Sequence, residues 1–263
     1  MIESRRLLAD LVRMRAALEA DLRERCEDEP GLDAFLQQEH RQAVEGERTA
    51  LPYAVWRDDR LTQVAVAWIL ACVFVRFLED NGLVDPPRLS GPAERRGRAL
   101  DEHTLYFRAH PTGSDRDYLL HVFRAVAALP VAGQLFDAEH NPIWSLEQSG
   151  RGFRAPSGDA AGRLLDLWRR IDPDSGYLAH DFTDPAWDTR FLGDLYQDLS
   201  ERARKQYALL QTPVFVEELI LDRTLTPAIG VRLPRSAPDR SGLRIGALPA
   251  GRLRAAGRAV GAA

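Results

Sequence analysis

Apolar residues recur at three- and four-residue spacing in several stretches of the chain, and this spacing predicts α-helices. Residues 4–26 predict an amphipathic helix that ends before Pro30. A longer apolar stretch predicts a helix from Asp58, as its cap, to Asn81 and Gly82, a pair suited to a left-handed stop. Helical spacing returns at residues 115–129 and 158–170, and the sequence therefore predicts a mainly α protein.

Residues 85–98 depart from this pattern, because they are rich in Pro, Gly and Arg and predict a loop. Apolar helical spacing resumes at 191–199 with Asp188 as the expected cap, and Thr212 with Pro213 has the hydroxyl cap and first-turn proline of another helix start.

Composition is typical of a globular protein, with 45% hydrophobic and 28% charged residues among 263. Cys26 and Cys72 are too isolated to suggest a zinc site or a disulfide framework, and a cytoplasmic location is expected. No export signal is expected in residues 1–22. The longest apolar run, residues 64–75, is shorter than the roughly 20 residues of a bilayer span, so no membrane contact is expected.

Charge is unevenly distributed. Residues 231–263 contain seven Arg and one acidic residue, which gives this tail a net charge of +6 and leaves −10 on the rest of the chain. Because enzymes acting on nucleic acids usually carry a basic surface, residues 1–230 alone do not have the charge of a strong DNA binder.

Four segments of the chain together resemble a known family. They are residues 63–82, 135–144, 180–185 and 191–229, and the last of these contains the sequences Phe-Leu-Gly-Asp-Leu-Tyr, Gln-Thr-Pro and Thr-Leu-Thr-Pro. As a set they are similar to the adenine-specific DNA methyltransferases of the PglX type, from phage-growth-limitation or type 2 BREX defence systems. The resemblance covers most of residues 50–229.

The resemblance implies S-adenosylmethionine as the cofactor and DNA as the substrate of the intact enzyme, with other defence-system subunits as further partners. It places Thr212 and Pro213 beside the cofactor, and it suggests that Arg202, Arg204 and Lys205 face DNA. In the family a glycine-rich turn then wraps the cofactor and an Asn-Pro-Pro-aromatic loop holds the flipped adenine. Neither motif occurs in this chain, so no catalytic residue is assigned and no cofactor binding by this chain is expected.

The composition of the tail at 231–263 suggests why these two motifs are missing. Of its 33 residues, 23 are Ala, Arg, Gly or Pro, and none is aromatic. Permitted codons for residues 239–253, read one base later, spell Ile-Asp-Pro-Ala-Cys-Gly-Ser-Gly-His-Phe, which is the missing cofactor turn. We therefore expect an out-of-frame, disordered tail that begins after about residue 230.

Other candidate residues have simpler interpretations. His140 and His180 lie near acidic residues, but no further ligands have suitable spacing, so both are expected to be loop or cap residues rather than metal ligands. Arg95, Arg96 and Arg98 are expected to be solvated loop residues rather than phosphate contacts.

The expected organisation is a helical N-terminal domain at 1–186, the first helices of a truncated Rossmann-like methyltransferase domain at 187–230, and the tail at 231–263. The first functional hypothesis is an inactive N-terminal fragment of an adenine-N6 DNA methyltransferase. The alternative is a non-enzymatic module that docks a separately encoded catalytic half or another defence subunit. In support of this alternative, an exposed apolar surface is expected at Leu195, Leu199, Val216, Leu219 and Ile220.

Overall fold

The computed structural model describes residues 4–129 and 156–183, together with positions 132, 136, 141, 143, 195, 198, 199, 216, 219, 220 and 222–224. Their secondary structure is helical apart from one antiparallel bridge between Ile171 and Leu178, so the predicted α class is confirmed. The helices are α1 (Ser4–Asp28), α2 (Pro30–Glu45), α3 (Tyr53–Asp80), the 3-10 turn η1 (Ala93–Arg95), α4 (Arg96–Ala109), α5 (Asp115–Ala127) and α6 (Gly158–Arg169).

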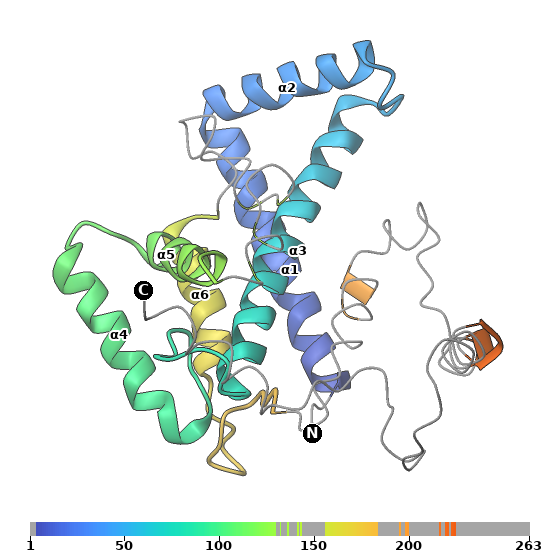
Figure 1. Ribbon diagram of the computed structural model, residues 1–263. Helices are drawn as coiled ribbons and strands as arrows, with labels where there is room; N and C mark the ends of the chain where they lie inside the picture. The colour runs from blue at the N-terminus through green and yellow to red at the C-terminus, as the bar shows by residue number, and fades with distance from the viewer. Residues whose placement is uncertain are drawn as a thin grey trace, which may run out of the picture.

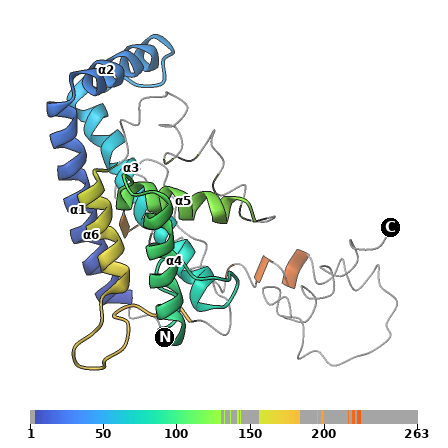
Figure 2. The ribbon, with the colours of Figure 1, turned by 90° about the vertical axis from the view of Figure 1, so that its left-hand side faces the viewer.

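Helices α1 and α3 form the long axis of the molecule, and α2 joins their ends as the third side of a triangle (Figure 1). The turned view places α6 beside α1, while α5 packs against α6 and reaches α3 (Figure 2). The apolar faces of these helices meet in one core that includes Leu11, Trp68 and Trp168. Helix α4 lies at the edge of this assembly (Figure 1).

Helix α3 is the central element of the core. It is apolar on nearly all sides, and by length and composition alone it could cross a membrane. Two-thirds of its most apolar window (67%) is nevertheless buried within the chain, and Trp68, Ile69 and Cys72 have no exposed surface. The Trp68 ring meets Phe123 of α5 edge to face at 5.5 Å. Such burial is typical of a core helix.

Local sequence explains several helix boundaries. Ser114 and Asp117 form a reciprocal capping box at the start of α5, and Ser157 caps α6 while its own N–H donates to Asp21 of α1. Gly82 follows α3 with a φ of +67°, which confirms the left-handed stop predicted after Asn81.

Helix α1 ends before Pro30, as predicted, but the sequence analysis missed α2, which begins at Pro30. A first-turn proline is tolerated there because it lacks only an N–H that the helix would leave unpaired. Two other predictions about boundaries were wrong. Helix α3 begins at Tyr53, five residues before the expected cap Asp58. The predicted loop 85–98 contains η1 and the first turn of α4, so Arg96 and Arg98 are helical.

The expected exposure of the later apolar residues was partly wrong. Leu195 and Leu199 are 5% and 0% exposed and belong to the core, and Arg15 of α1 donates a hydrogen bond to the Leu199 carbonyl at 2.6 Å. Leu219 and Ile220 are about half exposed, as expected. Leu199 is therefore held against α1.

Replacing Leu199 by Ala tests this packing. Loss of a fully buried side chain is expected to lower the free energy of unfolding by about 2 to 4 kcal/mol, measured by urea denaturation. Leu219→Ala is the matched control, and because Leu219 is 54% exposed its effect should stay below about 0.5 kcal/mol. Equal effects of the two substitutions would contradict the packing of Leu199 on α1.

Candidate functional site

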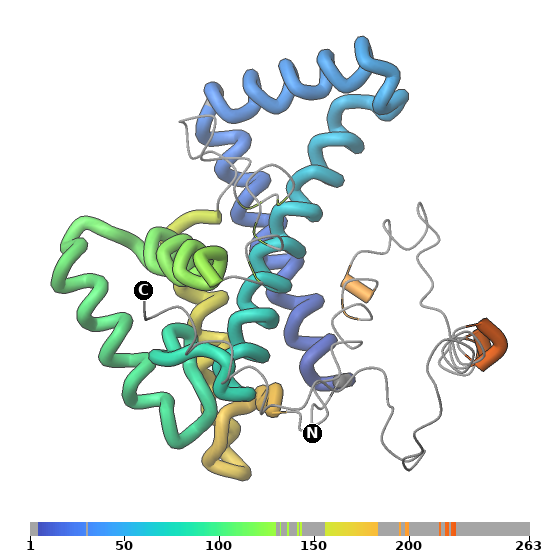
Figure 3. Tube along the Cα trace, viewed as in Figure 1, coloured from blue at the N-terminus to red at the C-terminus, as the bar shows by residue number. Residues whose placement is uncertain are grey.

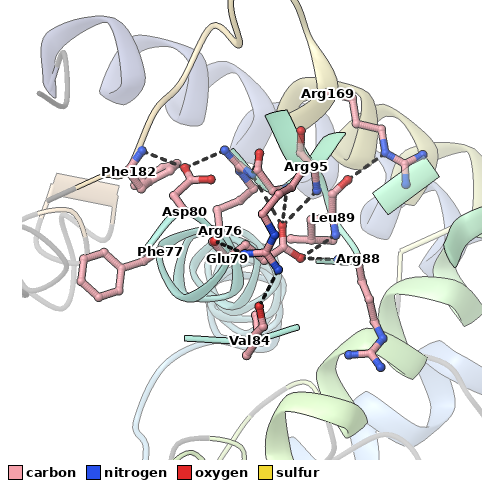
Figure 4. Close-up of polar contacts among 12 residues, drawn as sticks. Arg76, Phe77, Glu79, Asp80, Val84, Arg88, Leu89, Arg95, Arg169 and Phe182 are labelled. Atoms are coloured by element: carbon pink, nitrogen blue, oxygen red, sulfur yellow. Dashed lines mark hydrogen bonds and ion pairs between the residues drawn. The ribbon is translucent and has the colours of Figure 1, made fainter. Parts of the chain in front are cut away.

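A deeply buried polar cluster lies at the C-terminal end of α3 in the described part of the chain. Helical spacing places Arg76, Glu79 and Asp80 within one turn, and the side chains of all three are at most 1% exposed. This sequence, from Arg76 to Gly82, is part of the segment that carries the family resemblance. We call these three residues the α3 anchor (Figure 4).

Glu79 binds the loop that follows α3. Its two carboxylate oxygens accept hydrogen bonds from four successive backbone N–H groups, those of Arg88, Leu89, Ser90 and Gly91, at 2.6–3.0 Å. Four aligned N–H dipoles compensate the loss of hydration of a buried carboxylate. The loop conformation is therefore fixed around one side chain.

Arg76 and Asp80 bind a second segment, residues 180–182, about a hundred positions further along the chain. Arg76 donates to Asp80 Oδ2 at 2.7 Å, to the Gly91 carbonyl at 2.7 Å and to the His180 carbonyl at 3.3 Å. Asp80 Oδ2 also accepts from the Phe182 N–H at 2.9 Å. Figure 3 shows this segment running past the end of α3 after it leaves α6.

The negative charge of Asp80 is less well compensated than that of Glu79. Its Oδ1 is buried and has no hydrogen-bond partner among the described residues. Burial raises the pKa of Asp80 from 3.8 to about 6, although the Arg76 charge and the Phe182 N–H oppose this rise.

The other carbonyls of the loop face α5 and α6. The Tyr118 hydroxyl donates to the Arg88 carbonyl at 2.7 Å, and Arg169 Nε donates to the Leu89 carbonyl at 2.9 Å. The Arg95 guanidinium donates to Asp85 at 2.6 Å and to the Val84 carbonyl at 3.0 Å. Side chains from three helices thus fix a loop that has no regular secondary structure.

A second polar group joins residues 170–180 to α1. Asp10, 5% exposed, accepts hydrogen bonds from Arg13 and Arg170, and its Oδ2 lies 2.9 Å from His180 Nε2. Burial alone would raise the pKa of Asp10, but the two arginines outweigh burial and lower it. Burial lowers the pKa of His180 more than Asp10 raises it, so His180 is neutral near pH 7.

These groups stabilise the fold, and none has the setting of a catalytic group. The α3 anchor is enclosed, and His180 is 7% exposed and faces Asp10 and Trp168. The described residues hold no cluster of three or more potential metal ligands. Cys26 lines a shallow cavity with Asp33 and Arg57, but burial raises its pKa to about 11, so its thiol is unreactive near neutral pH.

The sequence-predicted site residues fall in two groups. Thr212, Pro213, Arg202, Arg204 and Lys205 lie outside the described residues, as does His140. His180 is in a loop, as expected, but its buried contact with Asp10 was not foreseen.

Of the three arginines near position 96, Arg95 and Arg98 both pair with Asp85, a contact that was not foreseen. The Arg98 side chain is 55% exposed, as expected for a solvated residue. The α3 anchor was itself missed. Its only sequence signal is the placement of three charges, three and four residues apart, at the end of an apolar run.

The fold and the enclosed cluster define an all-α structural module within the described part of the chain. Over 237 residues the chain is 45% identical to the adenine-specific methyltransferase PglX of Streptomyces coelicolor. The match covers 87% of this chain, which spans only about a fifth (19%) of the length of that relative. No known family profile and no solved structure matches the chain. The resemblance to PglX is therefore confirmed, for a part of the relative.

Glu79→Gln tests the hydrogen bonds by which the α3 anchor holds the loop at residues 88–91. An amide nitrogen cannot accept hydrogen bonds, so backbone N–H groups of the loop would lose their buried acceptor. The free energy of unfolding should fall by about 2 to 4 kcal/mol in urea denaturation. The control Glu45→Gln, on the exposed end of α2, should change it by less than about 0.5 kcal/mol. Full stability of the Glu79 variant would show that the loop does not depend on this carboxylate.

Asp80→Asn tests the pKa of the buried acid. Because its folded-state pKa lies above its ordinary value, the folded protein binds this proton more tightly than the unfolded chain does. Its stabilising contribution is present at low pH and is lost as pH rises through about 6. From about pH 5 to 7.5 the wild type should lose about 1 kcal/mol of stability relative to the Asn variant.

Urea denaturation of both proteins at the two pH values measures this difference. His180 is present in both proteins, so its contribution cancels in the comparison. A constant difference between wild type and variant would place the pKa of Asp80 outside this window.

Proposed function

We propose that these residues are the amino-terminal helical part of an adenine-N6 DNA methyltransferase of a phage-defence system. The match to PglX carries this proposal, since it extends over 87% of the chain at 45% identity. In the intact enzyme S-adenosylmethionine supplies the methyl group, DNA supplies the adenine, and the reaction takes place in the cytoplasm. Other defence-system subunits are further candidate partners.

The helical part supports the intact enzyme without performing the transfer. Its buried polar groups are used to fix segments of its own chain, as in the four N–H bonds to Glu79. Residues 1–263 include neither the glycine-rich cofactor turn nor the Asn-Pro-Pro-aromatic sequence. Without these elements there is no preorganised pocket for the cofactor and the flipped base. This polypeptide alone is therefore inactive.

The composition of residues 231–263 supports the frame-shift hypothesis, since 23 of these 33 residues are Ala, Arg, Gly or Pro and none is aromatic. Under this proposal the cofactor turn is encoded by the same DNA in another frame. The nucleotide sequence around codons 225–240 tests this directly, because the second frame must spell the glycine turn.

A second candidate function is a non-enzymatic module that docks a separately encoded catalytic half. The exposure of Leu219 and Ile220, at 54% and 52%, favours it because apolar side chains near one another on a surface often mark an interface. A downstream reading frame with its own start and an Asn-Pro-Pro-aromatic sequence is expected in this case. Co-expression of the two chains should then restore methylation that neither chain performs alone.

Cofactor binding tests the inactivity of this chain. Titration calorimetry with S-adenosylmethionine should give no binding heat, and a tritium-transfer assay on adenine-containing duplex DNA should give no incorporation. The full-length Streptomyces coelicolor PglX, under the same conditions, serves as the comparison protein for both measurements. Micromolar affinity of the 263-residue chain for the cofactor would refute the inactivity of this chain.

A further inference from the structure

Two histidines and two arginines from three different elements meet on the α4–α5 side of the molecule. His110 follows α4, His121 and Arg124 belong to α5, and Arg88 belongs to the loop held by Glu79. The side chains of His110, His121 and Arg124 are exposed, and Arg88 is partly exposed. We call these four residues the α4–α5 basic patch.

Aromatic packing holds the two histidines in place. The Tyr106 ring stacks on His110 with a centroid distance of 4.4 Å and an interplanar angle of 22°, and it contacts His121 at 5.1 Å. Tyr106 also meets Tyr118 edge to face at 5.2 Å. One ring from α4 therefore positions both imidazoles, so little side-chain entropy remains to be lost when they bind a ligand.

Arg88 is positioned by its backbone. Its N–H donates to Glu79 at 2.6 Å, and its carbonyl accepts from Tyr118 at 2.7 Å. Its guanidinium lies 3.8 Å from Glu102, a contact too long for a good hydrogen bond. The arginine is thus presented from a rigid loop while its charge is only weakly neutralised.

Burial and the charges near His121 both affect its protonation. Burial is the largest cause that lowers the pKa of His121, Arg88, His110 and Arg124 lower it further, and Glu102 raises it. Asp117 faces Tyr106 but is bound by Ser114 and Arg116. Arg88 and Arg124 are both positively charged, and a bound anion reduces the repulsion between their charges.

We propose that the α4–α5 basic patch binds the phosphodiester backbone of DNA. The assignment of DNA rather than another polyanion rests on the proposed function, whereas the anion-binding chemistry rests on the four side chains. Arginine and protonated imidazole donate charge-assisted hydrogen bonds to phosphate oxygens. The patch gives the otherwise acidic helical part a local surface for nucleic acid, so that it contacts the DNA that the intact enzyme modifies.

Fluorescence anisotropy with a short labelled DNA duplex at low salt tests the patch. The affinity of the full chain should rise as pH falls from about 7.5 to 5.5, because bound phosphate favours protonated His121. His110→Gln together with His121→Gln should remove most of this rise, and Arg124→Gln should weaken binding roughly threefold or more at both pH values. All variants keep the arginine-rich tail, so binding by the tail is the same in each.

Arg41→Gln, an exposed arginine on α2 at the far end of the molecule, is the matched control and should bind like the wild type. Equal losses in Arg41→Gln and Arg124→Gln, or unchanged binding in all patch variants, would overturn the patch. Equal competition by polyaspartate of matched charge would overturn the phosphate assignment. These outcomes do not depend on cofactor binding. The experiment can therefore contradict DNA binding by the patch without contradicting the proposed function, and the reverse.

Discussion

Four backbone N–H groups that converge on the Glu79 carboxylate are the contact on which the arrangement around α3 depends. The loop they belong to has no helix or strand to pair its backbone, and buried N–H groups must find acceptors. Once this loop is fixed, its carbonyls become acceptors for Tyr118 and Arg169, and so α5 and α6 are held to the same point. A single carboxylate on the last turn of α3 thereby determines how three helices meet.

The three charges of the α3 anchor are not balanced within the cluster. Arg76 lies between two carboxylates, 2.7 Å from Asp80 and 3.6 Å from Glu79, so the group carries one excess negative charge. Glu79 is compensated by backbone dipoles, but Asp80 has one oxygen without a partner among the described residues, and its pKa is raised to about 6. Desolvation makes such pairs weak sources of net stability. The benefit of the cluster is instead positional, since it joins residues 88–91 and 180–182 to one helix end.

The sequence was sufficient for features that arise within one helix and insufficient for those that join distant segments. Periodic apolar residues predicted α1, α5 and α6, and Gly82 predicted the end of α3, because propensity and capping act within a few residues. The end of α1 before Pro30 was predicted correctly but α2 was missed, since a proline after one helix and a proline at the start of the next have the same local signal. The partners of Glu79 and Asp80 could not be predicted, because their contacts depend on tertiary packing about 10 and 100 positions away.

Packing near Leu199 constrains how a larger enzyme would use the helical part. The Leu199 side chain is fully buried and its carbonyl accepts from Arg15 of α1. A segment that is only tethered would leave such a side chain exposed to water, at a cost of about 1.5 to 3 kcal/mol for a leucine. Helix α1 is in turn joined to residues 170–180 through Asp10, and those residues to α3 through Arg76. Leu199 is therefore linked to the α3 anchor through α1 and residues 170–180, so a larger protein that continues from Leu199 would begin from a fixed position rather than from a free linker.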